Sequence, residues 1–467
     1  MLVSFSVSNY KSFDKEQTFD MAASKITKHN DHVAVVNKKR ILKSALIFGA
    51  NAGGKTNLIR AIEFSSRIIR NGMKSVPLSK QYFRINVDNY QKPGVFKYHI
   101  MVDHNEYIYE LSISYSKQII LAEKLIKLTR AKKEILLYNR YLDSDGNPIV
   151  EKPQIKLSKE EETRLNVYLN DFEGSISADL QKKTILSDLA SRSNVQESIF
   201  QELSNVFDWF DRLIILFPES IFTGLNEMGK QDDKLAFFKS FMVYLDTGIQ
   251  NIESEEKHFD INELLGNIPA NIAEEMKADI AEKLQENPVT LRLGGEDALL
   301  LHKDSEGNIV YDQLQFDHGN PKDLFEYADE SDGTKRLFDL APLFFDITKH
   351  PIIIIDEIDR SLHTSVVRSY LEFFFEINKN RDAQLIATSH DTNLMDLEIM
   401  RQDEIWLIDR NEKNCSTINS LRNFNVRFDK RVAPDYLTNH YGGVPKTTKE
   451  NRIRLVKQTE EVIKEVE

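Results

Sequence analysis

The stretch GANAGGKT (Gly49–Thr56) decides the fold that we expect for this chain of 467 residues. It matches the pattern G-x-x-x-x-G-K-[ST] without a gap. The continuous apolar run Ser44–Phe48 comes directly before it, as is typical of a strand buried on both faces of a sheet. Apolar side chains then recur at helical spacing from Leu58 to Ile69, and Asn71-Gly72 is a good helix stop. The order strand, glycine-rich loop, helix predicts a phosphate-binding loop (P-loop).

The residue types of this loop suit the phosphates of ATP. Glycines let the backbone wrap closely and aim its N–H groups at phosphate oxygens. We expect Lys55 to reach the β- and γ-phosphates, and the Thr56 hydroxyl to complete the coordination of Mg²⁺. The residues expected to bind the nucleotide here are Gly49, Asn51, Gly53, Gly54, Lys55, Thr56 and Asn57.

A second buried strand is predicted to deliver two carboxylates. The run Ile352–Ile355 is followed by Asp356 and Glu357. Ligands of α/β sheets bind at the carboxyl ends of strands. We expect Asp356 to hold Mg²⁺, directly or through water, and Glu357 to position or deprotonate the attacking water. Alone, such a pair also fits a capped strand end, and the P-loop is what favours hydrolysis.

Two further polar motifs have positions that suit the same reaction. Thr388-Ser389-His390 follows the next short apolar strand, and a histidine there can bind the γ-phosphate and sense its loss. With Glu357 and Lys55, His390 completes the expected catalytic group. Ser331-Asp332-Gly333 leads into a predicted helix about twenty residues before the acids. Serine and glycine at the start of a helix can bind an anion. The same residues also occur where the serine is only an ordinary N-cap.

The remaining patterns predict an α/β fold with two additions. Strand-like segments from about 95 to 141 predict an antiparallel β subdomain. Residues from about 158 to 285 are expected to be mostly helical, for example Val206–Phe217 and Ile272–Leu284. Further strands are predicted at Val289–Leu293, Ala298–His302 and Ile309–Phe316, a hairpin at Glu404–Ile408 and Ser416–Leu421, and a charged helical tail from Thr447.

These patterns divide the chain into three parts. The expected head comprises residues 1–140 and 325–425, with a mixed or parallel sheet that holds the P-loop and with the antiparallel subdomain. Residues 141–324 form the mostly helical insertion, a candidate surface for oligomer or partner contacts. Residues 426–467 form a C-terminal tail segment.

Composition limits the classes of partner. Lys plus Arg is 61 and Asp plus Glu is 73, which gives a formal net charge of −12. An acidic chain is not suited to coat a nucleic acid without sequence preference. The short basic stretches Lys38–Arg40 and Arg130–Lys133 leave nucleic acid open as a partner. The single cysteine, Cys415, fits a reducing cytoplasm. No run approaches the roughly 20 apolar residues of a membrane span, so we expect no membrane partner.

Taken in order, these motifs resemble ABC-type ATPases, and the expected fold is then an ABC ATPase head. In that family Ser331-Asp332-Gly333 stands for the signature motif, which binds the γ-phosphate of ATP held by the partner protomer's P-loop. The resemblance therefore implies a head-to-head dimer with two sandwiched nucleotides. Asp359 falls where a D-loop would start, and Gln81 is a weak candidate for the Q-loop glutamine.

Within that family, the turn Asn9–Phe13 and the segment Asp356–His363 look like the RecF and SMC branch. The motif segments also resemble the ATPase subunits of bacterial phage-defence pairs, the RloA-like proteins and AriA of the PARIS system. They are Phe48–Asn57, Glu330–Leu340, Ile355–His363, Ala387–Leu394 and the late Tyr436–Pro445. This resemblance implies an ATPase that senses or scaffolds. Its partners would be a separate effector, often a TOPRIM-like nuclease, and a phage-encoded trigger protein.

Two alternatives stay open. One is a DNA repair or recombination ATPase of the RecF kind that clamps DNA between dimerised heads. The net charge of −12 and the lack of a sustained heptad run count against it. The other is a binding module with a degenerate, non-hydrolysing site, although every catalytic residue type is present.

Overall fold

The computed structural model forms two compact units. The P-loop unit comprises Leu2–Asp211 with Thr388–Glu467, and the carboxylate unit comprises Arg212–Ala387. The structure describes residues 1–173, 177, 179–192, 198–220, 232–259, 274, 278, 280–284, 289–292, 298–304, 306–345, 347–348, 351–424, 426–427, 431–444 and 449–466.

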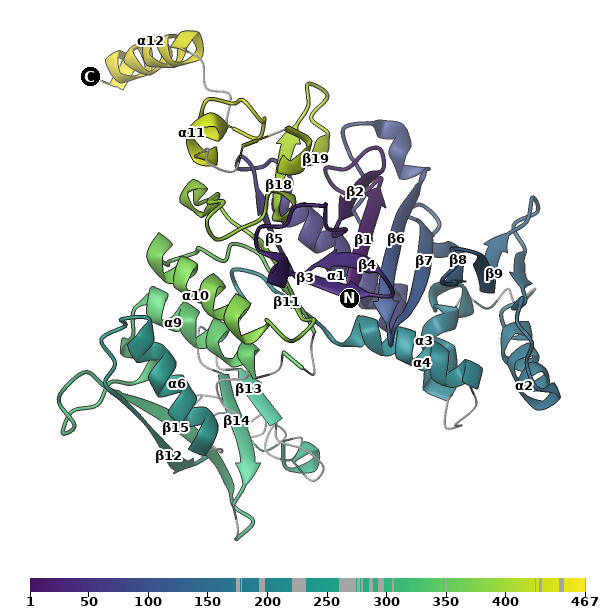
Figure 1. Ribbon diagram of the computed structural model, residues 1–467, viewed down its shortest axis with the longest axis horizontal. Helices are drawn as coiled ribbons and strands as arrows, with labels where there is room; N and C mark the ends of the chain where they lie inside the picture. The colour runs from purple at the N-terminus through teal and green to yellow at the C-terminus, as the bar shows by residue number, and fades with distance from the viewer. Residues whose placement is uncertain are drawn as a thin grey trace. The chain divides into compact units, whose positions relative to one another are not determined.

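The P-loop unit contains a seven-stranded sheet in the order β10-β9-β8-β7-β6-β1-β2 (Figure 1). All of its neighbouring strands run antiparallel. The antiparallel β subdomain is therefore confirmed, and it also includes the N-terminal strand. Its strands are β1 (Leu2–Ser8), β2 (Gln17–Asp20), β6 (Pro93–Val102), β7 (Asn105–Ser114), β8 (Ile119–Leu128), β9 (Glu134–Leu142) and β10 (Pro148–Glu151).

The helix after the P-loop, α1 (Lys55–Asn71), packs on this sheet. The buried Tyr98 hydroxyl of β6 lies 2.6 Å from the Ser65 hydroxyl and donates to the carbonyl of Ile62 at 3.1 Å. The Tyr98 ring also meets the edge of Phe210 at 5.1 Å. One tyrosine thus contacts both α1 and α4. The other helices of this part are α2 (Lys159–Asn170), α3 (Ile185–Arg192) and α4 (Ser198–Asp211).

The buried carboxylate of Glu123 in β8 holds the start of α3 on the sheet. It accepts hydrogen bonds from the Tyr109 and Tyr138 hydroxyls at 2.9 and 2.8 Å. It also accepts from the backbone N–H groups of Ile185 and Leu186 at 2.7 and 3.1 Å. Burial raises the pKa of the Glu123 carboxyl, and these hydrogen bonds oppose that rise. Four donors thus depend on one side chain.

We therefore expect Glu123→Ala to lower the free energy of unfolding by about 3–5 kcal/mol, because it leaves four buried donors without their acceptor and removes the negative charge near the buried Arg140. Denaturant unfolding of the full chain measures this loss. Glu110→Ala is the matched control, because Glu110 forms a surface ion pair with Lys97 and should matter by at most about 1 kcal/mol. Equal losses for the two variants would contradict the structural role of Glu123.

The strand before the P-loop belongs to a second group of strands in the same unit. β5 (Ser44–Phe48) pairs in parallel with β18 (Ile405–Arg410), and β18 pairs antiparallel with β19 (Ser416–Ser420). The predicted late hairpin is confirmed. A further hairpin joins β3 (Val33–Val36) to β4 (Lys39–Leu42). The unit also contains α11 (Val432–Leu437) and the predicted helical tail, α12 (Lys449–Val466).

The carboxylate unit contains three parallel strands and a four-stranded antiparallel sheet. The parallel strands are ordered β11-β16-β17, and the antiparallel sheet is ordered β12-β15-β14-β13. Its strands are β11 (Leu213–Leu216), β12 (Asn251–His258), β13 (Val289–Arg292), β14 (Ala298–Lys303), β15 (Ile309–Asp317), β16 (Ile352–Ile355) and β17 (Gln384–Thr388). Its helices are α6 (Asp232–Tyr244), α9 (Asp332–Leu340) and α10 (Thr364–Ile377).

Aromatic side chains hold the helices of the carboxylate unit together. Phe338 of α9 stacks on Phe316 of β15 with ring centroids 4.7 Å apart. Phe344, just after α9, lies 4.8 Å from Tyr370 of α10 and 5.4 Å from Phe241 of α6. Figure 1 shows α6, α9 and α10 grouped beside β12 and β15. This core fixes the helix α9, which begins at the predicted signature residues.

The prediction of a mostly helical region is only partly correct. The structure has α2, α3, α4 and α6 there, and it also has the strands β11 to β15. Val206–Phe217 is not one helix, because α4 ends at Asp211 and Leu213–Leu216 pairs in parallel with β16. A short continuous apolar run fits either a buried helix or a buried strand. Ile272–Leu284 lies largely outside the described residues.

The predicted domain boundaries differ from the divisions between the two units, which fall at 211/212 and 387/388. The functional division into head, insertion and tail therefore stays a prediction. Among the described residues, we find no helix with the length and hydrophobicity that crossing a bilayer requires.

Candidate functional site

The P-loop is wrapped so tightly that its glycines cannot take a side chain. A Cβ atom on Gly49 would lie 2.2 Å from the carbonyl oxygen of Ile408. A Cβ atom on Gly53 would lie 2.9 Å from the carbonyl oxygen of Ala50. Gly54, the N-cap of α1, has a φ of +122°, which side chains rarely allow. The loop therefore has the close backbone course and the helix N-terminus that suit a polyphosphate.

Lys55 lies inside this loop. Its side chain is 5% exposed, and its ammonium donates to the carbonyl oxygen of Gly49 at 2.7 Å. The Lys55 Nζ atom also lies 3.4 Å from Nδ1 of His390. A protonated lysine can only donate, so we infer that Nδ1 accepts and that the ring proton is on Nε2. The imidazole of His390 is exposed to solvent at this point.

Three polar side chains form hydrogen bonds to the P-loop or to the start of α1. Sequence reasoning did not identify them as part of the site. The Ser416 hydroxyl of β19 donates to the carbonyl of Gly53 at 2.6 Å. The Arg410 guanidinium of β18 donates to the carbonyl of Ala52 at 2.8 Å. The Ser12 hydroxyl accepts from the Asn57 amide at 2.9 Å. The predicted nucleotide contact of Asn57 stays a prediction, because its amide already has this partner.

The late glycine motif also packs on the P-loop. A Cβ atom on Gly443 would lie 3.5 Å from the Cα atom of Gly49. Gly443 has a φ of +83°, and its carbonyl accepts from the buried Tyr436 hydroxyl at 2.7 Å. The segment that the sequence singled out only by resemblance therefore has a physical role beside the loop.

The other loop residues lie as follows. Asn51 is exposed, and Thr56 is half-buried in the first turn of α1. Gln81 accepts a hydrogen bond from the Lys11 N–H through its own carbonyl at 2.7 Å, so it lies beside the Asn9–Phe13 turn. Its Q-loop role stays a prediction.

In the carboxylate unit, the two predicted acids follow β16. Asp356 is 1% exposed, and its N–H donates to the carbonyl of Leu216 at 2.8 Å. Glu357 has a φ of +53°, a left-handed conformation that costs a non-glycine residue about 1–3 kcal/mol. Such strain persists where the surroundings impose it, and it is common at active sites. The surroundings therefore fix the backbone conformation of Glu357, and that conformation sets the direction in which its side chain leaves the backbone.

Arg336 reaches this strained backbone with its side chain, and the Arg360 N–H also donates to the Glu357 carbonyl at 3.1 Å. It is 5% exposed in α9, and its Nη2 atom lies 3.4 Å from the carbonyl oxygens of both Asp356 and Glu357. Burial lowers the pKa of the Arg336 guanidinium, and Asp339 opposes this shift. Its Nε and Nη1 atoms are buried and have no hydrogen-bond partner among the described residues. Sequence reasoning missed Arg336, because one arginine in an amphipathic helix gives no pattern.

The predicted signature and D-loop residues lie together. The Ser331 hydroxyl caps α9 by accepting from the Thr334 N–H at 3.2 Å. A Cβ atom on Gly333 would lie 2.8 Å from the carbonyl oxygen of Ser361, whose φ is +60°. Asp359 begins the same loop, and its backbone carbonyl accepts from the Leu362 N–H at 3.1 Å. Ser331 is thus an ordinary N-cap in this structure, and its role toward ATP stays a prediction.

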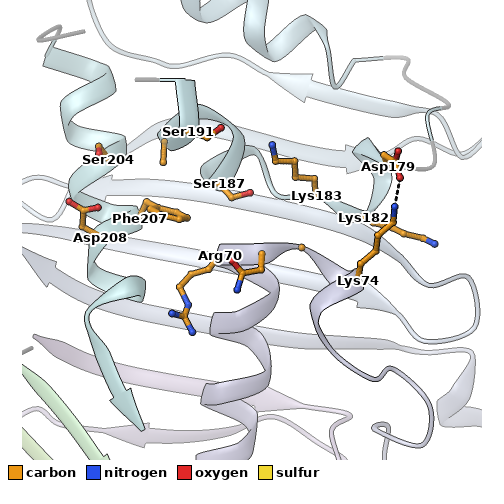
Figure 2. A pocket seen from close by; sticks show the side chains of 13 residues that line it. Arg70, Lys74, Asp179, Lys182, Lys183, Ser187, Ser191, Ser204, Phe207 and Asp208 are labelled. Atoms are coloured by element: carbon orange, nitrogen blue, oxygen red, sulfur yellow. Dashed lines mark hydrogen bonds and ion pairs between the residues drawn. The ribbon is translucent and has the colours of Figure 1, made fainter. Parts of the chain in front are cut away.

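A separate cavity of about 520 Å³ lies at the other end of α1, and its lining includes four cationic side chains (Figure 2). Three of them are in ion pairs. Lys74 pairs with Asp179 at 2.6 Å, Lys183 with Asp188 at 2.8 Å and Arg70 with Asp211 at 3.3 Å. The positive charge of the cavity is thus largely balanced, and we assign it no ligand.

Comparison with known proteins identifies the family. A family described as "AAA domain, putative AbiEii toxin, Type IV TA system" matches residues 44–396. The chain belongs to this family. The match begins at β5 and contains the P-loop, the two acids and His390, and the chain is accordingly a P-loop ATPase that binds a nucleotide. No curated protein matches the sequence.

Two solved structures are similar over most of their length. The SmcHead bound to the C-winged helix domain of ScpA has 13% identity and a TM-score of 0.39, covering 91% of this chain and 99% of that chain. An SMC head domain from Thermotoga maritima has 12% identity and a TM-score of 0.33, covering 90% of this chain and 98% of that chain. Likenesses of this strength are too weak to assign a partner or a substrate.

The contacts of Arg336 predict that replacing this residue slows ATP hydrolysis without lowering the thermal stability of the chain. We expect Arg336→Met to lower kcat for ATP hydrolysis by about 10²-fold, because the Asp356 and Glu357 carbonyls lose the side chain that links them. Affinity for ATP should change little. The unfolding midpoint should not fall, because removing a buried, partly unsatisfied charge is often neutral or stabilising.

Steady-state kinetics and thermal unfolding measure both quantities. Lys335→Met is the control, since it removes a cation from the half-exposed neighbouring position of the same helix. A large fall in the unfolding midpoint would show that Arg336 is needed for folding and not for positioning.

Proposed function

We propose that this ATPase is the sensor or scaffold subunit of a bacterial anti-phage defence system, and that it controls a separate effector protein through ATP-dependent dimerisation of its heads. The observation that carries the ATP part is the Lys55–His390 pair inside a P-loop that cannot take side chains. The family description, which names a toxin of a Type IV TA system, favours a role in a toxin-effector system. The effector is proposed to be a TOPRIM-like nuclease, and the trigger a phage-encoded protein.

The proposed reaction assigns one role to each group. Lys55 and the loop N–H groups bind the phosphates of ATP, and Thr56 and Asp356 hold Mg²⁺. The metal, when bound, offsets the phosphate charge. Glu357 accepts the proton of the attacking water, and Nε2–H of His390 donates to the γ-phosphate. Burial of Asp356 fits a carboxylate that faces a cation and not solvent.

The dimer is the second part of the proposal. Ser331 and Gly333 at the start of α9 would bind the γ-phosphate of ATP held by the partner subunit, with Asp359 in the adjoining loop. The support is the close approach of Gly333 to the Ser361 backbone, where a Cβ atom would lie 2.8 Å from the Ser361 carbonyl oxygen, so the signature residues and that loop are neighbours. ATP binding then brings two heads together, and hydrolysis releases them.

A pull-down from the native host tests the effector. Glu357→Gln should keep ATP bound and trap the dimer, whereas Lys55→Ala should not bind ATP. We expect a nuclease encoded by a neighbouring gene to co-purify with the first variant and to be depleted with the second. Equal recovery with both variants would contradict control by ATP.

The RecF-like alternative makes a different prediction for the same experiment. It expects repair or replication factors with DNA and no neighbouring nuclease. It also expects turnover that DNA stimulates and that salt steeply suppresses. A lack of phage resistance and of inducible toxicity in cells that express the chain with its neighbouring gene would likewise reject the defence role.

A further inference from the structure

Helix α12 lies at the C-terminal end of the chain (Figure 1), and its apolar side chains are exposed to solvent. Every residue from Lys449 to Ile463 is exposed, including Leu455 at 63% and Val462 at 59%. At 3.6 residues per turn, five side chains fall within about one third of the helix circumference. These side chains, the α12 stripe, are the apolar Leu455, Val456, Val462 and Ile463 with Thr459, whose hydroxyl donates to the carbonyl of Leu455 at 2.9 Å. Arg452 lies on the same side of the helix, at the basic end of the stripe. A contiguous apolar stripe on a charged helix marks an interaction surface.

The charges of α12 are separated by sign along the helix. Lys449–Lys457 has four cations and one acid, and Gln458–Val466 has three acids and one cation. The helix dipole favours acids near the start and cations near the end. The order in α12 is the reverse, so it does not stabilise the isolated helix. This order favours a binding partner that places acidic residues beside Lys449–Lys457 and basic residues beside Gln458–Val466.

We propose that the α12 stripe binds α12 of a second copy of this chain, with the two helices antiparallel. Antiparallel pairing places each basic half beside the acidic half of the other helix, and it does so twice by symmetry. Parallel pairing would place like charges together. A lone helix of this length is marginal in water, and burial of the stripe stabilises it. This contact does not depend on the proposed function.

Charge reversal tests the pairing in the nucleotide-free full-length protein by sedimentation equilibrium at low salt. One variant carries Glu460→Lys, beside the stripe in the acidic half, and the other carries Arg452→Glu, on the stripe side of the basic half. Each alone should self-associate about tenfold or more weakly than the wild type. An equimolar mixture of the two should recover association, and high salt should remove the recovery.

Matched controls separate the stripe from general effects of charge. Arg454→Glu changes the same number of charges in the same half as Arg452→Glu, but on the side of the helix away from the stripe, and should cost far less association. Leu455→Ser with Val462→Ser should abolish association, whereas Ile453→Ser, outside the stripe, should retain it. Circular dichroism and ATP affinity of each variant confirm that the chain is folded.

Cysteine cross-linking in a Cys415→Ser background tests the orientation. Antiparallel helices keep like residues apart, so Arg452→Cys alone should not cross-link. Its mixture with Ile463→Cys should. Self-cross-linking of Arg452→Cys, a mixture of charge variants that associates no better than either alone, or wild-type association of Leu455→Ser with Val462→Ser would each overturn the proposal. If these variants bind ATP as the wild type does, such an outcome rejects the α12 contact without rejecting the proposed ATPase function.

Discussion

Replacing Glu357 by glutamine is expected to lower kcat for ATP hydrolysis by about 10²–10⁴-fold, the range that a positioned general base contributes. Glutamine has the size of glutamate but no basic oxygen that can take a proton at neutral pH. The backbone at this position is held at a φ of +53°, with Arg336 at its carbonyl. The side chain of the variant should therefore lie where the carboxylate lies, and only the chemistry should be lost.

Affinity for ATP is the second half of this prediction. Because Glu357 is proposed to act on water and not on phosphate, the dissociation constant of ATP should change little. Phosphate release measures turnover, and a fluorescent ATP analogue measures binding. Glu376→Gln is the matched control, since that glutamate lies on α10 with a side chain 73% exposed. Turnover in Glu357→Gln equal to that of the wild type would instead support the non-hydrolysing binding module.

The P-loop and the acidic strand end were predictable because their chemistry requires a fixed order of residue types. Ala45–Phe48 and Ile352–Ile355 have no polar residue that another structure would expose, and each lies in a strand that is buried throughout. By contrast, Leu213–Leu216 is equally apolar but follows a helical pattern without a break. Only its pairing with β16 distinguishes a strand from the end of a helix.

The supports of the candidate site were not predictable, because they depend on contacts between distant parts of the chain. Ser416 and Gly53 are 363 residues apart, yet they share a hydrogen bond of 2.6 Å. No local spacing encodes such a pair. Gly443 was singled out only through resemblance, and its contact with Gly49 supplies the reason. The chemical roles of the site residues themselves remain predictions that depend on kinetics.

Replacing Lys55 by alanine is expected to weaken ATP binding by roughly 10- to 100-fold, because charge-assisted hydrogen bonds are worth about 1.5–3 kcal/mol. The lysine lies 5% exposed within the loop, so its ammonium needs little further ordering to meet a phosphate. Lys74→Ala, beyond the other end of α1, is the matched control, since that side chain is 68% exposed and forms a surface ion pair with Asp179.

Two readouts distinguish the loss of Lys55 from the loss of Glu357. Titration calorimetry should show weak binding in Lys55→Ala and near-normal binding in Glu357→Gln. Thermal unfolding should agree, because a ligand raises the stability of the folded chain by RT ln(1 + [L]/Kd). ATP should then raise the unfolding midpoint of Glu357→Gln but hardly that of Lys55→Ala. If ATP stabilised both variants equally, the nucleotide would be bound without the Lys55 ammonium, and the role proposed for the P-loop lysine would be wrong.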